Sequence, residues 1–364
     1  MEKIAQMWLR IQTVLFPFLE EGLGPLSEAE QKLAAVLELV RIEEYVPVRW
    51  WHLGRPPADR CALARSFVAK MVYGLSETSD LIERLKSSSG LRRQCGWEWA
   101  GEVPSEATFS RSFAEFAGSG LASRAHAALI AEYEGDRLVG HLSRDSTDIV
   151  AREKAAVKPK PAASKPARKK GRPRKGEVRE AVPAAPGRLE RQGEMSLEEM
   201  LLDLPRACDW GVKRKHGKSY YWKGYKLHVD WADGEIPISC VLTSASLHDS
   251  QAAIPLATLS ASRVQSLYDL MDAAYDAAAI TAHSLSLGHV PIIDPNPRRK
   301  GAEEMAPARK RRFDERSTAE RGNSLLKECY GGRTVRVRGF AKVLSHLMFG
   351  MVALTADRLL SLVT

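Results

Sequence analysis

One carboxylate lies between two cations at helical spacing in the stretch 313–327. Arg316, Glu320 and Lys327 are separated by four and seven residues without an intervening proline, so one face of a helix can carry all three. The neighbouring cations favour the ionised form of the glutamate. Such a carboxylate suits a hard cation such as Mg²⁺, and the two cations suit phosphate groups. An exposed helix with ordinary i,i+4 ion pairs is the alternative interpretation.

Two further acids lie where strands are predicted to end. Alternation over 138–143 predicts a short strand that delivers Asp145 at its C-terminal tip. The apolar stretch 264–271 is typical of a buried strand, and Asp272 follows it directly. Asp145 could instead be a turn residue, which is the commoner role of Asp in an Asp-Ser-Thr sequence.

The three acids can meet if the strands and the helix share one edge of a sheet. Ligands bind at such an edge in open α/β sheets. Three carboxylates gathered there would not all stay ionised without a counter-cation, because like charges disfavour ionisation. Two Mg²⁺ ions about 4 Å apart would satisfy them and would provide an in-line displacement site for phosphoryl transfer. The arginine and lysine beside the third acid would hold the scissile phosphate.

Length, charge and cysteine content limit the class of protein. The 364 residues leave room for two or three domains. A net charge of +9 and a pI near 9.3 favour a polyanionic partner, nucleic acid before membrane. Five cysteines without a Cys-x-x-Cys pair fit a reducing cytoplasm. No signal peptide is recognised, and the uncharged run 343–356 is too short to span a bilayer, so a soluble cytoplasmic protein is expected.

The basic charge is concentrated in one segment. Residues 151–180 contain twelve Lys and Arg against three Glu, a surplus equal to that of the whole chain. The Ala/Pro-rich composition predicts a disordered, basic insertion at 151–218. An unspecific linker is one interpretation, since any basic tract binds phosphate. One tract within it also resembles an AT-hook, narrow enough for an A·T-rich minor groove and expected to bind DNA: Lys170, Gly171, Arg172, Pro173 and Arg174.

The flanking regions differ in their hydrophobic period. Residues 1–135 have helical spacing and could form a helix-turn-helix DNA reader or a plain helical bundle. An Asp-Gly turn at 233–234 between two β-rich runs predicts a hairpin. A helix is expected to start in 244–250. His248 and Asp249 there could be catalytic auxiliaries, and the commoner role for such residues is a helix N-terminal cap.

Together these segments resemble the DDE transposases of bacterial insertion sequences. Asp145, Asp272 and Glu320 match the acid triad of that family. The third segment is similar to its Tyr-x2-Arg-x3-Glu-x6-Lys signature, with Phe313 in place of the tyrosine. Further stretches also look like its members: Arg144-Asp145-Ser146-Thr147, 223–228, 242–250, 272–276 and 103–111.

The resemblance implies a fold and an activity. The fold would be α/β, with an RNase H-like mixed-sheet catalytic domain at 136–364 behind an all-α DNA-binding domain at 1–135. The activity would be cleavage at the element's terminal inverted repeats and strand transfer into target DNA. Two Mg²⁺ ions, or Mn²⁺, would be held by the catalytic residues Asp145, Asp272 and Glu320. Arg316 and Lys327 would contact DNA. A homodimer, association with the nucleoid and no membrane contact are expected.

Two departures leave alternatives open. Phe313 removes any hydroxyl contact that the signature tyrosine makes. The 48 positions from Asp272 to Glu320 leave no room for the β-rich insertion of some hairpin-forming relatives, so formation of a DNA hairpin stays open. A non-catalytic DNA-binding protein derived from a transposase, or an RNase H-like nuclease that cuts without joining, would carry the same residues. No pattern in the amino-acid sequence indicates which DNA sequence at the element ends is recognised or which target DNA is preferred.

Overall fold

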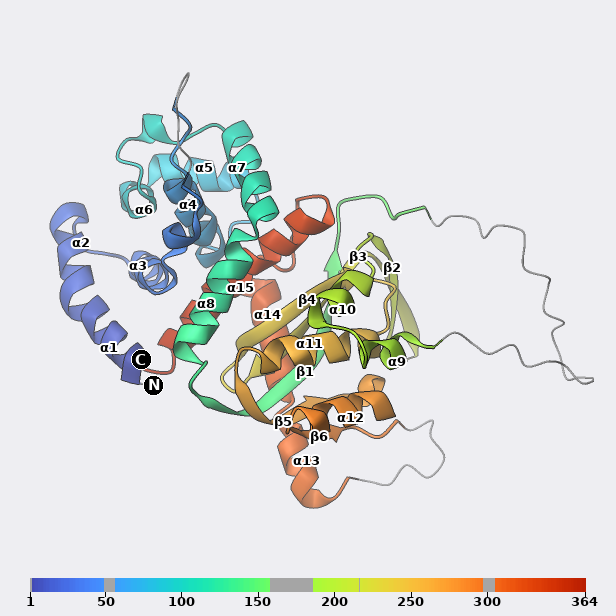
Figure 1. Ribbon diagram of the computed structural model, residues 1–364. Coiled ribbons are helices and arrows are strands. Elements are labelled where there is room, and N and C mark those ends of the chain that lie inside the picture. Colours follow the sequence, from blue (N-terminus) through green and yellow to red (C-terminus); the bar gives the residue numbers. More distant parts are fainter. Residues whose placement is uncertain (1, 49–55, 158–185, 216, 297–304) are drawn as a thin grey trace, which may run out of the picture.

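The computed structural model describes residues 2–48, 56–157, 186–215, 217–296 and 305–364 (Figure 1). Its N-terminal region is all helical, and its C-terminal region places helices against one mixed sheet. The N-terminal helices are α1 (Glu2–Arg10), α2 (Phe16–Leu23), α3 (Glu28–Val40), α4 (Arg60–Val72), α5 (Thr78–Ser87), α6 (Ser89–Cys95), α7 (Glu106–Ser119) and α8 (Leu121–Tyr133), with short turns η1 (Ile11–Leu15), η2 (Ile42–Tyr45) and η3 (Ala100–Glu102).

The second region begins with the long strand β1. The strands are β1 (Leu138–Val150), β2 (Asp209–Lys215), β3 (Lys218–Ala232), β4 (Ile236–Ser244), β5 (Gln265–Met271) and β6 (Val290–Ile293). The helices are α9 (Arg188–Gln192), α10 (Leu197–Asp203), α11 (Ala253–Ala261), α12 (Ala278–Ser286), α13 (Pro307–Asp314), α14 (Ser317–Cys329) and α15 (Phe340–Leu360), with turns η4 (Asp249–Ala252) and η5 (Ala273–Tyr275).

The sheet has the order β2-β3-β1-β5-β6, and β4 also pairs with β3. β3 is antiparallel to β1, β2 and β4, whereas β5 is parallel to β1 and β6 is parallel to β5. The expected hairpin is present, since β3 pairs with β4. Gly234 in the turn between them takes a positive φ of 84°, which glycine adopts without strain. The expected α/β class, with a mixed sheet behind an all-helical region, is confirmed.

Two predicted boundaries were wrong. β1 continues to Val150 because it pairs with β3 as far as Gly224, so Asp145 lies inside the strand and not at its tip. The stretch 313–327 is also two helices and not one. α13 ends at Asp314 and α14 begins at Ser317, with a tight turn in which the Arg316 amide donates to the Phe313 carbonyl at 2.9 Å.

The insertion predicted at 151–218 is ordered in its described C-terminal part. α9, α10 and β2 all lie between residues 186 and 215. Met200 is buried against Ile254 and Tyr275, and Leu204 is buried against Leu256. These apolar side chains give the segment a core to pack on, which the basic composition of 151–180 does not show. The AT-hook-like tract at 169–175 lies outside the described residues.

The last helix completes the core of the N-terminal region. α15 packs against α3, α4, α7 and α8, and it lies among them in Figure 1. Phe349 of α15 stacks at 5.6 Å from Phe67 of α4, which lies 5.0 Å from Phe113 of α7. α15 is long and apolar enough to span a membrane by length and composition, but 83% of its apolar window is buried inside the protein. It is a core helix of the fold.

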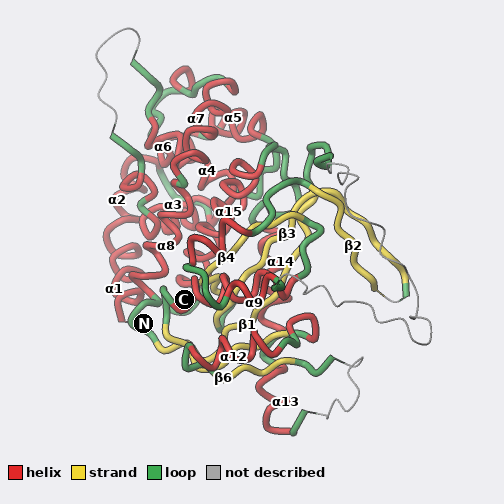
Figure 2. The backbone as a smooth tube through the Cα atoms, turned by 45° about the vertical axis from the view of Figure 1, so that its right-hand side comes forward, coloured by secondary structure: helices red, strands yellow, loops and turns green. Residues whose placement is uncertain are grey.

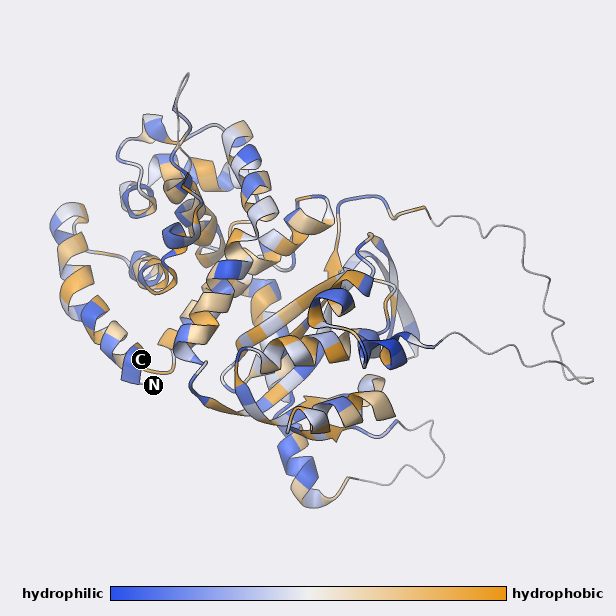
Figure 3. Ribbon diagram, viewed as in Figure 1, coloured by the Kyte–Doolittle hydropathy of each residue, from blue (hydrophilic) through white to orange (hydrophobic). Residues whose placement is uncertain are grey.

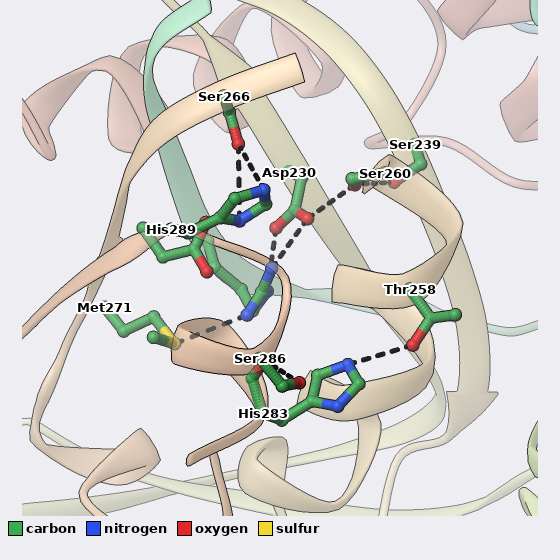
Figure 4. A network of polar contacts seen from close by, with 11 residues as sticks. Asp230, Ser239, Thr258, Ser260, Ser266, Met271, His283, Ser286 and His289 are labelled. Carbon is green, nitrogen blue, oxygen red and sulfur yellow. Dashed lines mark hydrogen bonds and ion pairs between the residues drawn. The ribbon is translucent and has the colours of Figure 1, made fainter. Parts of the chain in front are cut away.

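A buried ion pair fixes β1 to β3. Arg144 donates from Nε and Nη2 to the two carboxylate oxygens of Asp230, each at 2.8 Å, and both residues are at most 1% exposed. Ser260 of α11 also donates to Asp230, at 2.6 Å, and Ser239 contacts Ser260 (Figure 4). Since side chains alternate along a strand, Arg144 on the α11 face leaves Asp145 facing the opposite side.

The other face of the sheet receives α14 at very close range. Gly322 of α14 lies over Trp231 of β3, and a Cβ at Gly322 would lie 2.4 Å from Trp231 Cε3. We expect Gly322→Ala to destabilise the protein by roughly 1–3 kcal/mol, because the buried indole cannot retreat. Urea unfolding of the variant would measure this loss.

Gly118→Ala is the matched control. Gly118 is also helical, in α7, but a Cβ there meets nothing within 4 Å. Alanine should therefore stabilise that helix by up to about 1 kcal/mol. If both variants are equally stable, α14 is not held by contact at Gly322.

His126 links α8 to the sheet, and its burial should make the stability of the fold sensitive to acid. Its Nε2 hydrogen-bonds to the Pro237 carbonyl at 2.9 Å, and burial, with the charge of Arg263, lowers its pKa to about 3. Between pH 3 and pH 6.5 the unfolded chain binds a proton that the folded protein does not, so stability falls as pH falls below 6.5. Between pH 7 and pH 5, we expect the free energy of unfolding of His126→Gln to fall by roughly 2 kcal/mol less than that of the parent.

Urea unfolding at the two pH values would test this, with His248→Gln as the control. His248 is exposed, so its variant should follow the parent. Equal losses in the parent and in His126→Gln would show that His126 is protonated without cost in the folded protein.

Candidate catalytic site

The parallel pairing of β1 with β5 brings two of the predicted acids together. The last paired residues are Arg144 and Met271, so Asp145 and Asp272 are the next residue of each chain segment. Both line one hollow of about 130 Å³. The register, and not a pair of strand tips, therefore places these carboxylates side by side.

Asp145 is half-buried in a hollow lined mainly by polar and charged side chains. Burial raises the pKa of its carboxyl to about 6, and the negative charge of Asp272 acts in the same direction. Asn323 of α14 donates from Nδ2 to Asp145 Oδ2 at 3.0 Å. The positive charge of Arg316 acts on both Asp145 and Asp272. The charge of Arg316 thus favours the ionised form of both acids.

Asp272 caps the short turn that follows β5. Its Oδ1 accepts a hydrogen bond from the Ala274 amide at 2.9 Å, which orients the carboxylate at the start of η5. Burial raises the pKa of Asp272, although less than that of Asp145. A half-buried pair of acids with raised pKa values is typical of a functional site.

Two more acids line the hollow, but each has its own cation. Lys327 donates to Asp148 at 2.9 Å, and Lys226 donates to Asp249 at 2.8 Å. Burial alone would raise the pKa of both carboxyls. Lys327 outweighs burial at Asp148, and His228 with Lys226 outweighs it at Asp249, so both pKa values are lowered. Asp148 and Asp249 are therefore ionised partners of lysines. The remaining lining residues are Ser146, Val212, Lys213 and Trp222.

Glu320 lies outside the hollow. Its side chain is 65% exposed, and Arg316 donates to it at 3.0 Å, as the four-residue spacing predicted. Among the described residues no group of three His, Cys, Asp or Glu side chains is close enough to hold a metal ion. The structure thus brings Asp145 and Asp272 together and leaves Glu320 beyond Arg316.

The sequence patterns missed several residues of the site. Asn323 lies three positions after Glu320, so it shares that face of α14, and this spacing is the signal that could have identified it. Asp148 lies three positions after Asp145 on β1, a spacing that gives no such signal because side chains alternate along a strand. Asp249 was weighed as an auxiliary and does begin η4, where it accepts from Lys226. No spacing in the sequence connects Lys213 or Trp222 with the acids.

The donor set of the hollow suits a hard divalent cation. Asp145 and Asp272 present carboxylate oxygens, which Mg²⁺ prefers over nitrogen or sulfur. Burial of Asp145 disfavours its ionised form, and a cation would reverse that preference. α13, which precedes α14 and packs on β6, carries the cations Arg309, Lys310, Arg311 and Arg312 and is hydrophilic in Figure 3. A helix of this charge suits a polyanion.

Two carboxylates thus lie side by side on parallel strands of an RNase H-like mixed sheet, with lysines around them. Two family models match the chain: "Transposase domain (DUF772)" over residues 21–115 and "Transposase DDE domain" over residues 197–356. The chain belongs to the DDE transposases of the insertion-sequence type. Asp272 and Glu320 lie inside the second matched range, 197–356. Asp145 lies between the two matched ranges. No curated protein and no solved structure matches the chain.

Proposed function

We propose that this transposase cleaves DNA at the ends of its element and joins them to target DNA. The observation that carries the proposal is the placement of Asp145 and Asp272 at adjacent positions past the last β1–β5 pair, in one hollow. Family membership supports DNA as the substrate. Cytoplasmic, nucleoid-associated action and assembly as a homodimer belong to the same proposal.

The residues have separate roles in this proposal. Asp145 and Asp272 would hold Mg²⁺ or Mn²⁺, with Glu320 as the third ligand, and such ions activate the attacking oxygen and stabilise the leaving one. Asn323 orients the Asp145 carboxylate through its 3.0 Å hydrogen bond. Arg316, whose charge acts on both acids, would contact the scissile phosphate. Lys327, paired with Asp148, would contact the DNA backbone beside it.

The basic tract adds a second DNA contact to the proposal. Lys170, Gly171, Arg172, Pro173 and Arg174 would bind the minor groove of A·T-rich DNA, or would bind phosphates without sequence preference. In either case affinity should fall steeply with salt, because bound counterions are released from DNA.

A cleavage and joining assay tests the proposal. The purified full chain is incubated with labelled DNA that carries the inverted repeats flanking its gene, with and without Mg²⁺. We expect cleavage at the repeat ends and then strand-transfer product, both only with the metal. Cleaved DNA that is never joined would identify a nuclease instead. Binding of the repeats without cleavage would identify a DNA-binding protein whose acids are unused.

A further inference from the structure

The strands β2 and β3 extend beyond the rest of the sheet as a two-stranded ribbon. β3 pairs with β1 only from Gly224 onward, whereas its first residues, 218–223, pair with β2. In Figure 2 this ribbon stands out from the helices and strands of the sheet. Residues 212–214 and 217–221 of the ribbon are exposed, so a partner can reach both of its faces.

The ribbon exposes large apolar side chains that a partner could cover. Trp210 is 58% exposed, Val212 57%, Tyr220 54% and Tyr221 70%. The pairing register puts Trp210, Val212 and Tyr221 on one face of the ribbon and Tyr220 on the other, so both faces expose apolar groups that a partner could cover.

The charge of the ribbon selects the kind of partner. Residues 209–224 contain five Lys and Arg and a single acid, Asp209. Aromatic rings interleaved with cations are the combination that binds single-stranded nucleic acid, because bases stack on the rings while the cations bind phosphates. A second copy of this ribbon would bring the same positive charge, which opposes self-association.

The pairing register places one aromatic row on the face with Lys213. Lys213 lies opposite Tyr220, and Gly211 lies opposite Trp222, so Lys213, Tyr220 and Trp222 share a face of the ribbon. Gly211 allows this arrangement, since a Cβ there would lie 2.3 Å from Trp222 Cζ2. The indole of Trp222 is held by its Nε1 donating to the Tyr225 carbonyl at 3.1 Å.

This row continues from the catalytic hollow. Lys213 and Trp222 line the hollow together with Asp145 and Asp272, and Tyr220 is two residues further along the ribbon. A strand that leaves the hollow over Trp222 would therefore meet Tyr220 next. The neighbouring Tyr221 points to the opposite face, because side chains alternate along β3.

We propose that the β2–β3 ribbon binds an unpaired DNA strand next to the scissile phosphate, with its bases on Trp222 and Tyr220 and its phosphate on Lys213. The inference rests on the proposed function for the identity of the polymer. It adds that the end of the DNA is opened at the site, because stacking on these rings requires unpaired bases.

Binding of a twelve-nucleotide thymidine oligomer to the full chain, with EDTA and without metal, tests the ribbon apart from catalysis. We expect Tyr220→Ala to weaken binding roughly tenfold. Tyr220→Trp should keep the parent affinity. Tyr221→Ala is the matched control, one residue away on the other face, and should change the affinity less than twofold. Affinity for a blunt duplex of the same length should not depend on Tyr220.

A cross-linking experiment removes the contribution of the basic segment. An oligomer with one 5-iodouracil is irradiated on the parent chain, and the adducts are mapped by mass spectrometry. Adducts at Tyr220 and Trp222 are expected. Adducts only at Tyr221, or equal losses of oligomer and duplex affinity in Tyr220→Ala, would overturn the proposal. So would a parent dimer that becomes a monomer in Tyr220→Ala with unchanged oligomer affinity.

The two proposals can fail separately. If the parent never cleaves DNA but Tyr220→Ala loses oligomer binding, the ribbon inference stands and the proposed catalysis falls. If the parent cleaves and joins DNA while Tyr220→Ala binds the oligomer as the parent does, only the ribbon inference falls.

Discussion

Asp145→Asn is expected to abolish cleavage of inverted-repeat DNA while leaving the fold intact. Asparagine has the same shape but cannot supply the negative charge that a divalent ion requires. The loss should be about 10³-fold or more, the order that one preorganised electrostatic group contributes in other enzymes. Because burial already disfavours the ionised carboxyl of Asp145, the neutral amide should keep or raise the melting temperature.

Metal binding gives this prediction a second readout. Mg²⁺ should raise the melting temperature of the parent, because a ligand that binds only the folded state stabilises it. The same addition should have a smaller effect on Asp145→Asn. Glu328→Gln is the matched control, since Glu328 lies on α14 beyond Lys327 and pairs with Arg333. An Asp145→Asn enzyme that cuts as fast as Glu328→Gln would remove Asp145 from the mechanism.

Asp230→Ala is expected to cost about 3–5 kcal/mol of unfolding free energy. The substitution leaves the Arg144 guanidinium, which is 1% exposed, as a buried charge without its bidentate partner. Arg144 directly precedes Asp145 on β1, so cleavage activity should fall as well. Urea unfolding would measure the stability, and the assay above would measure the activity.

A double variant separates the ion pair from simple packing. Arg144→Met with Asp230→Leu replaces both charges by apolar groups of similar size. Buried ion pairs replaced in this way often keep or gain stability. We therefore expect the double variant to recover most of what Asp230→Ala loses. If it is as unstable as the single variant, packing around Ser260 and Met271, and not the charge, determines the loss.

The sequence was most informative where local chemistry determines structure. The Asp-Gly turn, the apolar strand before Asp272 and the Arg316–Glu320 pair all depend on neighbours within a few residues, and each is present. The extension of β1 to Val150 was not predictable, because it depends on pairing with Gly224, which is 74 positions away. The order of α9 and α10 likewise comes from packing on distant helices.

In the candidate site, too, local features were predictable and features set by distant pairing were not. Residue types and spacing selected Asp145, Asp272 and Glu320, and the structure brings the first two into one hollow. Glu320 is exposed on the first turn of α14, which begins a new helix after Arg316, and no proline or glycine in the sequence marks that break. Lys213 and Trp222 reach the hollow only through the β2–β3 register, which no local pattern encodes.

The position of α15 has a consequence for how this protein is made. The side chains of α15 fill the space between helices that were synthesised some 230 to 320 residues earlier. Phe349 of α15, for example, contacts Phe67 of α4 and Phe113 of α7. Domains usually fold as the ribosome releases them, the N-terminal one first. Here the first helices cannot complete their core until α15 has been translated, so a nascent chain acquires a finished N-terminal region only after Asp145, Asp272 and Glu320 have also emerged.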